Sequence, residues 1–175
     1  ANLLTFYLFY ELLTLGTLPL VMHAMNPQAQ YAGKKYIVYS IGGAAFAFIA
    51  MVFMMYYGTS LDFTFGGVLD MLQVAGHEQW LLVVFVLAFF GFGVKAAVFP
   101  LSGWLPSAGV APTPVTALLH AVAVVNAGVY ALVRLIYYTF GTEFLSGSWA
   151  QYVVMSAALV TIVYGSSMAL RTPHL

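Results

Sequence analysis

The chain has 175 residues, of which 63% are hydrophobic and only 6% are charged, and its mean hydropathy is +0.96. An ordinary soluble domain has about 25% charged residues, so this composition excludes a water-soluble monomer and is typical of helices that face lipid or one another. The formal net charge is zero and the only basic run is Lys34-Lys35, which argues against a nucleic-acid partner. Cysteine is absent, which excludes disulfides, thiolate chemistry and cysteine-ligated iron–sulfur clusters.

Five segments contain the roughly 20 mostly apolar residues that a membrane-spanning helix needs. In chain order they are 2–23, 36–57, 80–105, 113–140 and 149–170. Polar and turn residues fill the connections at 26–35, 58–79, 107–112 and 141–148. No segment requires a strand. The sequence therefore predicts an all-α, polytopic transmembrane helix bundle with five spans, forming a single membrane domain over residues 1–175.

Charged residues outside the spans are divided by sign between the two ends of this bundle. Lys34 and Lys35 precede the second span, and Arg171 follows the fifth. If each span crosses once, the acidic residues of the connections lie at the opposite end: Asp62, Asp70, Glu78 and Glu143. Cytoplasmic loops carry an excess of lysine and arginine. We therefore expect the N-terminus outside and the two lysines in the cytoplasm.

The third span is irregular. Gly91 and Gly93 precede Lys95, and Pro100 and Pro106 follow it, so flexible backbone and missing amide donors are concentrated in one stretch. We expect a helix break near Lys95. Non-helical backbone at membrane depth is tolerated only where it is buried in protein or lines a wet cavity, and discontinuous helices of this kind often mark binding or conduction sites.

Two charged side chains lie inside the predicted spans. Glu11 is midway along the first span, where an acid costs about 2.5 to 3.5 kcal/mol on insertion scales and usually faces a partner in the bundle. It is either functional or part of a structural ion pair between helices. Lys95 is a candidate proton switch, because burial disfavours an ammonium and a nearby acid restores it. The alternative is that its stem reaches the cytoplasmic interface.

The fourth span carries four further polar candidates. His120 is the histidine best placed to relay protons, although a lone histidine is also common as a hydrogen-bonded core residue. Asn126 and Tyr130 share a helix face and are expected either to hold water in a channel or to form an interhelical hydrogen bond. Arg134 is interpreted as an interface anchor. Small residues along the second and fourth spans, including Gly42, Gly43, Ala47 and Gly128, indicate close helix packing.

Two longer stretches carry a family resemblance. GVKAAVFPLSGWLPSA at 93–108 and APTPVTALLHAVAVVNAGVYALVR at 111–134, with Tyr10-Glu11-Leu12 in the first span, are similar to the antiporter-like proton-translocating membrane subunits. These subunits are shared by respiratory complex I, energy-converting hydrogenases and Mrp-type cation/proton antiporters. The run LLHAVAVV followed by AGV most resembles the D-type Mrp and hydrogenase-associated members.

The resemblance implies a full subunit of about fourteen helices with two inverted repeats, each with a broken helix that bears a central lysine. This chain would hold the fifth to ninth helices. Glu11, Lys95 and His120 match the family's glutamate, broken-helix lysine and histidine. The chain begins with Ala1 and ends soon after the last predicted span, so we expect a fragment of a longer subunit. The location expected for this subunit is a prokaryotic inner membrane.

This sequence departs from the family pattern at three positions. Many members have a lysine where Asn126 stands, which removes a titratable group from the implied relay. Many also have aspartate and histidine where Ser107 and Gly109 stand, which leaves the assignments of Glu11 and Lys95 unaffected.

The leading hypothesis is proton translocation as part of a redox-driven complex, with Glu11 modulating Lys95 and relay through His120. The alternatives are an Mrp-type cation/proton antiporter subunit without redox coupling and a scaffold fragment without transport. The partners expected are other membrane subunits, the bilayer, and protons or sodium ions. No cofactor is expected in this chain, because a haem needs two axial ligands and only His120 lies well inside a span. No residue set for hydrolysis is evident either.

Overall fold

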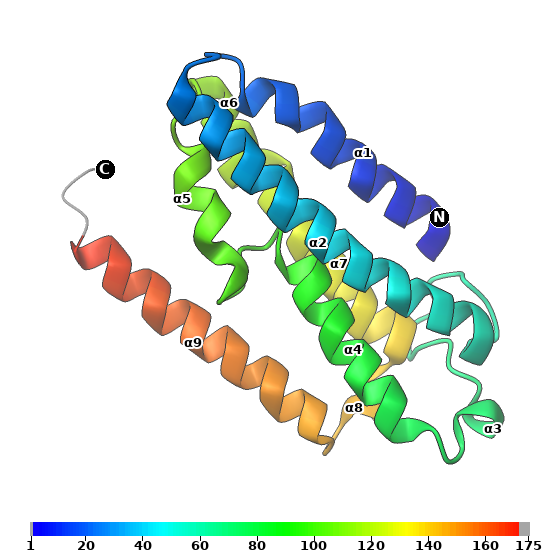
Figure 1. Cartoon of the computed structure of the whole chain (residues 1–175). Helices are drawn as coiled ribbons and strands as arrows, with labels where there is room; N and C mark the ends of the chain where they lie inside the picture. The colour runs from blue at the N-terminus through cyan, green and yellow to red at the C-terminus, as the bar shows by residue number, and fades with distance from the viewer. Residues whose placement is uncertain (1, 172–175) are drawn as a thin grey trace.

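Two long helices at the start of the chain form an antiparallel pair (Figure 1). The computed structural model describes residues 2–171; the remainder of the expected 1–175 domain lies outside the described residues. Helix α1, Leu3–Val21, begins where the Asn2 side chain accepts a hydrogen bond from the backbone N–H of Thr5 at 2.9 Å. This N-cap satisfies one of the amides that a helix start leaves free.

Helix α2, Pro27–Tyr57, begins much earlier than predicted. Asn26 caps it by accepting from Ala29 N at 2.7 Å, and Pro27 occupies the first helical turn. The expected connection at 26–35 was wrong, because Asn-Pro is a helix start and the polar residues that follow it continue the helix. Lys34 and Lys35 consequently lie on α2 and not in a loop.

The predicted third span is not one continuous helix. After the short α3, Met71–Val74, helix α4 runs over Glu78–Gly93 and ends there. Turns follow, then the 3₁₀ turn η1, Leu101–Gly103, and the short helix α5, Trp104–Ala108.

The predicted fourth span is helical throughout but changes type along its length. It comprises α6, Thr113–Ala117, the π-helical η2, Leu118–Val122, then α7, Val124–Arg134, and the π-helical η3, Leu135–Phe140. The short α8, Thr142–Leu145, leads to α9, Trp149–Arg171, which agrees with the predicted fifth span.

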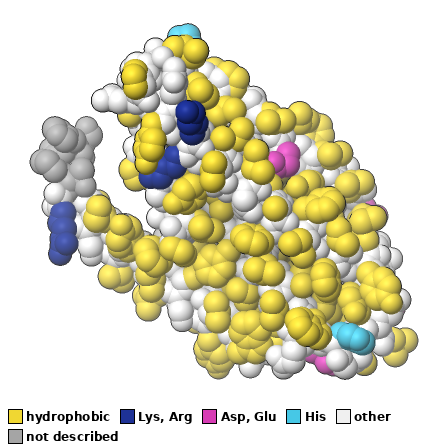
Figure 2. Space-filling model, in the orientation of Figure 1, with side chains coloured by type: hydrophobic (Ala, Val, Ile, Leu, Met, Phe, Trp, Pro, Cys, Tyr) yellow, Lys and Arg dark blue, Asp and Glu magenta, His cyan; other side chains and the backbone are white. Residues whose placement is uncertain are grey.

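Four helical segments are long and apolar enough to cross a membrane. They are Leu3–Val21, Pro27–Tyr57, Thr113–Phe140 and Trp149–Arg171. Helix α4, with 16 residues, is apolar but shorter. Among residues 2–171 the regular structure is helical, with isolated bridges but no strand. The all-helical part of the prediction is confirmed. The face of the molecule drawn in Figure 2 carries many hydrophobic side chains and few charged ones, which fits a lipid environment.

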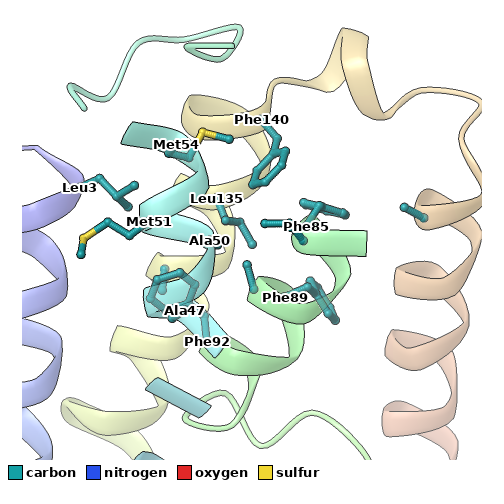
Figure 3. Close-up of a cluster of buried hydrophobic side chains, with 14 of the residues drawn as sticks. Leu3, Ala47, Ala50, Met51, Met54, Phe85, Phe89, Phe92, Leu135 and Phe140 are labelled. Atoms are coloured by element: carbon teal, nitrogen blue, oxygen red, sulfur yellow. The ribbon is translucent and has the colours of Figure 1, made fainter. Parts of the chain in front are cut away.

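Close backbone contact between α2 and α4 builds the centre of the bundle. A Cβ added at Gly91 would lie 2.6 Å from the carbonyl oxygen of Gly43 and 2.9 Å from Ala47 N, so only glycine fits this crossing. Figure 3 shows side chains from α1, α2, α4 and η3 converging beside this crossing, among them Met51, Phe89 and Leu135. The packing predicted from small residues in the second span is present at Gly43 and Ala47, but the prediction was wrong for Gly42, which is exposed and has nothing within 4 Å of an added Cβ. The contact at Gly43 and Ala47 positions α4 where the chain turns at Lys95.

Candidate functional site

The turn that follows α4 holds Lys95 inside the bundle. The amide of Val98 donates to Gly93 O at 2.9 Å, and the indole Nε1 of Trp104 donates to Val94 O at 2.7 Å. A Cβ at Gly128 of α7 would collide with the backbone of Lys95 and Ala96. The turn is therefore clamped between α5 and α7, and its freed carbonyl at Val94 is satisfied by a buried side chain, as backbone at membrane depth requires.

Lys95 is fully buried, with 0% of its surface exposed. Its Nζ donates to the backbone carbonyl of Tyr10 and lies 3.4 Å from the centre of the Tyr10 ring. The Tyr10 hydroxyl in turn donates to Phe92 O at 3.1 Å. Tyr10 thus joins α1 to the end of α4 and solvates the ammonium with a carbonyl oxygen and a π face. The alternative in which the lysine stem reaches the surface does not match this burial.

Glu11 acts on this ammonium through its electric field. It is half-buried and interacts electrostatically with Lys95, but no ion pair or hydrogen bond joins the two side chains in this structure. Its carboxylate oxygen Oε1 is buried and has no hydrogen-bond partner within residues 2–171. In a medium of low dielectric constant, a carboxylate next to an ammonium strongly affects whether each group is charged.

His120 lies next to α5, the helix that follows the interrupted segment. It lies in the π-helical η2, where Ala123 N bonds to Leu118 O at 2.9 Å, and its ring contacts the backbone of Leu105 in α5. Its Nε2 is buried and has no partner in the described chain. Single π-helical turns are frequent at functional sites because they re-aim one side chain within a helix.

The other three candidates of this span do not join the lysine site. Asn126 is exposed and donates to Ala121 O at 2.7 Å, so its amide bonds within its own helix. Arg134 Nε donates to the Tyr130 hydroxyl at 2.8 Å, and its guanidinium lies 4.4 Å from the centre of the Tyr138 ring. Arg134 and Tyr130 therefore form an aromatic-lined cluster of their own.

Sequence reasoning missed Tyr10 and Trp104 as site residues. In the sequence both look like ordinary aromatic residues of apolar helices. Their contacts involve backbone carbonyls, and a sequence motif does not show which carbonyls are free to accept a hydrogen bond. The one available signal was that Tyr10 directly precedes Glu11. Within residues 2–171 no group of three or more potential metal ligands occurs.

The match to known proteins extends over the whole chain. The model of the NADH:quinone oxidoreductase/Mrp antiporter transmembrane family matches residues 1–175. The chain belongs to this family. It is therefore an antiporter-like integral membrane protein, as its motifs and apolar helices indicated.

Individual relatives come from both branches of the NADH:quinone oxidoreductase/Mrp antiporter family. The chain is 30% identical to the A subunit of the Na(+)/H(+) antiporter of Alkalihalophilus pseudofirmus, over 99% of its own length and 21% of the relative. It is 32% identical to NAD(P)H-quinone oxidoreductase chain 4 2 of Thermosynechococcus vestitus, over 99% of this chain and 32% of the relative. It is 28% identical to the chloroplastic NAD(P)H-quinone oxidoreductase subunit 5 of Piper cenocladum, over 97% of this chain and 23% of the relative.

This chain thus spans between 21% and 32% of the length of these relatives. The family predicted from the motifs is confirmed. The special likeness to D-type members stays a prediction.

Proposed function

We propose that this chain forms part of a proton path through an antiporter-like membrane subunit, with Lys95 as the group that binds and releases the proton. The observation that carries the proposal is a lysine with 0% exposure, placed in a non-helical turn over the Tyr10 ring and in the electric field of Glu11. A buried lysine whose charge depends on one neighbour can change its protonation when that neighbour moves or titrates.

Glu11 sets the charge state of Lys95 in this mechanism. While the carboxylate is close and ionised, it stabilises the ammonium together with the carbonyl and ring of Tyr10. When Glu11 moves away or takes up a proton, desolvation favours neutral lysine, and the proton leaves Nζ. His120, at the α5 side of the turn and with an unpartnered Nε2, is the next acceptor in the proposed relay.

In this proposal α4 and α5 are the two halves of one broken membrane-crossing helix, which gives five crossings in a single domain. Helix α4 ends at Gly93, two residues before Lys95, and Pro100 follows the turn. We also propose the orientation with the N-terminus outside and Lys34 in the cytoplasm of a prokaryotic cell, following the excess of basic residues at that end.

The partners would be other membrane subunits of a larger complex, because relatives are named as subunits of antiporters and of quinone oxidoreductases. This chain would contribute part of a half-channel, and energy would come from a redox reaction elsewhere in the complex. The second candidate is cation/proton antiport without redox coupling, which the names of the Na(+)/H(+) antiporter relatives favour. Sodium-dependent proton movement would identify this second function.

The test is proton translocation by the assembled complex in proteoliposomes, with the amount of assembled complex measured for each variant. Lys95→Ala should abolish translocation through this subunit. Glu11→Gln should impair it, and Glu11→Asp less so, because aspartate keeps the charge. Lys34→Ala is the matched control, since Lys34 is exposed and lies outside the site. Full coupled activity in Lys95→Ala would refute the mechanism.

A further inference from the structure

Four hydroxyl groups are buried together between α1 and α2, away from the lysine itself. Their residues are Thr14, Thr17, Tyr36 and Ser40, with exposed fractions of 0%, 4%, 0% and 1%. We call them the hydroxyl cluster. Two apolar helices that face lipid do not need four hydroxyls along their seam, so the cluster requires an explanation.

The hydrogen bonds within the cluster run in one direction. Thr17 Oγ1 lies 2.7 Å from Leu13 O and 2.7 Å from the Tyr36 hydroxyl. The threonine has a single proton, which it donates to the carbonyl, so the Tyr36 hydroxyl donates to Thr17 Oγ1. The lone pairs of the Tyr36 oxygen remain free to accept from another group.

The other two hydroxyls have only the Tyr36 hydroxyl within reach. Thr14 and Ser40 interact with it, yet neither Thr14 Oγ1 nor Ser40 Oγ makes a hydrogen bond of good geometry with any group within residues 2–171. Buried polar atoms left without a partner destabilise a fold, and apolar side chains of the same shape would avoid this cost. Polar sites of this kind typically bind a water molecule that bonds to two to four groups.

One end of the hydroxyl cluster reaches Glu11. Thr14 is one turn beyond Glu11 on α1, the spacing at which helical side chains are neighbours. Glu11 also interacts electrostatically with Tyr36, and its own Oε1 is buried without a partner among residues 2–171. Unpartnered oxygen atoms therefore extend from the carboxylate to the cluster.

The other end reaches the part of the molecule that bears Lys34 and Lys35. Tyr36 packs on the Trp104 ring at 5.1 Å between ring centres, and the preceding Lys35 donates from Nζ to Ser107 Oγ at 3.0 Å. Ser107 also lines a surface recess of about 380 Å³ between α2 and the end of α5. The helices α2 and α5 thus border both the cluster and the recess.

We propose that the hydroxyl cluster binds water and carries protons between Glu11 and the recess at Ser107. Each hydroxyl or water oxygen would accept a proton on one side and release one on the other, so no group is changed after a transfer and no further reactant is needed. This inference rests on the proposed function of Lys95 and adds the route by which Glu11 exchanges protons with one side of the membrane.

A dry cluster that only joins two helices makes the opposite prediction for apolar replacements. If no water is bound, Thr14→Val and Ser40→Ala remove unpartnered polar atoms, and stability should stay the same or rise with transport unchanged. If water is bound, the same changes remove its ligands and interrupt the route.

The experiment measures proton translocation and thermal stability of the assembled complex carrying Thr14→Val, Ser40→Ala and the double variant. Thr139→Val is the matched control, because Thr139 is 2% exposed and its hydroxyl bonds to Arg134 O outside the cluster. We expect about a tenfold loss of translocation in the double variant, the size of one lost hydrogen bond to the transferred proton. Thr14→Ser, which keeps the hydroxyl, should retain transport.

Lys95→Ala measured in the same series separates the two proposals. Normal transport in the double variant together with an inactive Lys95→Ala overturns the water route and leaves the role of Lys95 standing. Normal transport in Lys95→Ala overturns both. If the double variant does not assemble, the two single variants decide in the same way. A density map of the assembled complex gives a second readout: a water within hydrogen-bonding distance of Thr14 Oγ1 and Ser40 Oγ supports the route, and dry contact between these side chains overturns it.

Discussion

Lys95 is solvated mainly by atoms that belong to Tyr10. The ammonium donates to the Tyr10 carbonyl and lies over the Tyr10 ring, while Glu11 contributes through its electric field. A cation over a desolvated aromatic ring gains about 2 kcal/mol or more. The Tyr10 carbonyl carries no titratable charge and can accept a hydrogen bond from the ammonium or from the neutral amine, so it holds the lysine in both states. The carboxylate is then left as the variable neighbour.

Lys95→Arg should abolish proton translocation although it keeps the positive charge. A guanidinium stays protonated at any physiological pH, so it cannot release the proton that the mechanism requires. Translocation by the assembled complex is the measurement, with Lys34→Arg as the control at an exposed lysine of α2. Wild-type transport in Lys95→Arg would show that only the charge of this side chain matters.

Trp104→Phe should lower the stability of the protein by about 1–3 kcal/mol, because it leaves the buried Val94 carbonyl without its donor. The indole of Trp104 is 0% exposed and donates to Val94 O at 2.7 Å. Thermal unfolding in detergent measures the effect. Trp80→Phe provides the control, since Trp80 is 68% exposed. Equal unfolding temperatures for the two variants would mean that this hydrogen bond does not hold the turn at Lys95.

At the scale of the helices, the sequence predicted the elements well wherever composition alone decides them. The first and fifth spans are helices close to their predicted bounds, because long apolar runs have no other stable structure in lipid. The start of α2 was missed because lysine and glutamine were interpreted as loop residues, although both are good helix formers. Composition and the Asn-Pro start signal gave opposite indications there, and the start signal was correct.

The geometry of the site was only partly predictable. The glycines and prolines around Lys95 predicted an irregular segment there, and α4 does end at Gly93. The π-helical turns at 118–122 and 135–140 have no sequence signal that we recognised. The contact between Lys95 and Tyr10 depends on packing between helices, because the two residues are 85 positions apart in the chain.

Gly91→Ala should destabilise the crossing of α2 and α4 by about 1–3 kcal/mol, the usual cost of overpacking a core. Its Cβ would lie 2.6 Å from Gly43 O, and backbone cannot move aside as a flexible side chain can. Gly42→Ala is the matched control on α2, because nothing lies within 4 Å of a Cβ there. Alanine favours helix over glycine, so the control should be neutral or slightly stabilised.

Thermal unfolding and the yield of assembled complex measure both glycine variants. The decisive result is whether Gly91→Ala unfolds at a lower temperature than Gly42→Ala. If Gly91→Ala is as stable as Gly42→Ala, the two backbones are not held in contact at this crossing.

At the scale of the whole molecule, much of the apolar surface remains without a protein partner in this chain. Along α9, Ala150 is the one buried residue within the described part of the helix, and large side chains such as Leu159 and Ile162 are exposed. The relatives are longer than this chain, which covers 21% of the Alkalihalophilus antiporter protein and 32% of the Thermosynechococcus oxidoreductase protein. Lipid or further protein must cover these faces, since apolar surface of this extent is unstable in water.

The last prediction concerns how this molecule lies in the membrane. Lys34 is exposed on α2 near the connection to α1, whereas Glu78 is exposed at the start of α4. Glu143 is exposed on α8. It lies at the same end of the bundle as Glu78, since Trp149, at the start of α9, donates from Nε1 to Oε1 of Gln79, the residue after Glu78, at 3.0 Å. The two acidic positions therefore share one end of the bundle, and the basic position lies at the other (Figure 1).

Single-cysteine variants test this directly, since the chain contains no cysteine of its own. In sealed vesicles, a membrane-impermeant maleimide should label Lys34→Cys only from the cytoplasmic face, because basic residues are retained there. Glu78→Cys and Glu143→Cys should be labelled only from the opposite face. Labelling of positions 34 and 78 from the same face would show that α2 does not cross the membrane between them, and the proposed path from the recess through Glu11 to Lys95 would then not lead across the bilayer.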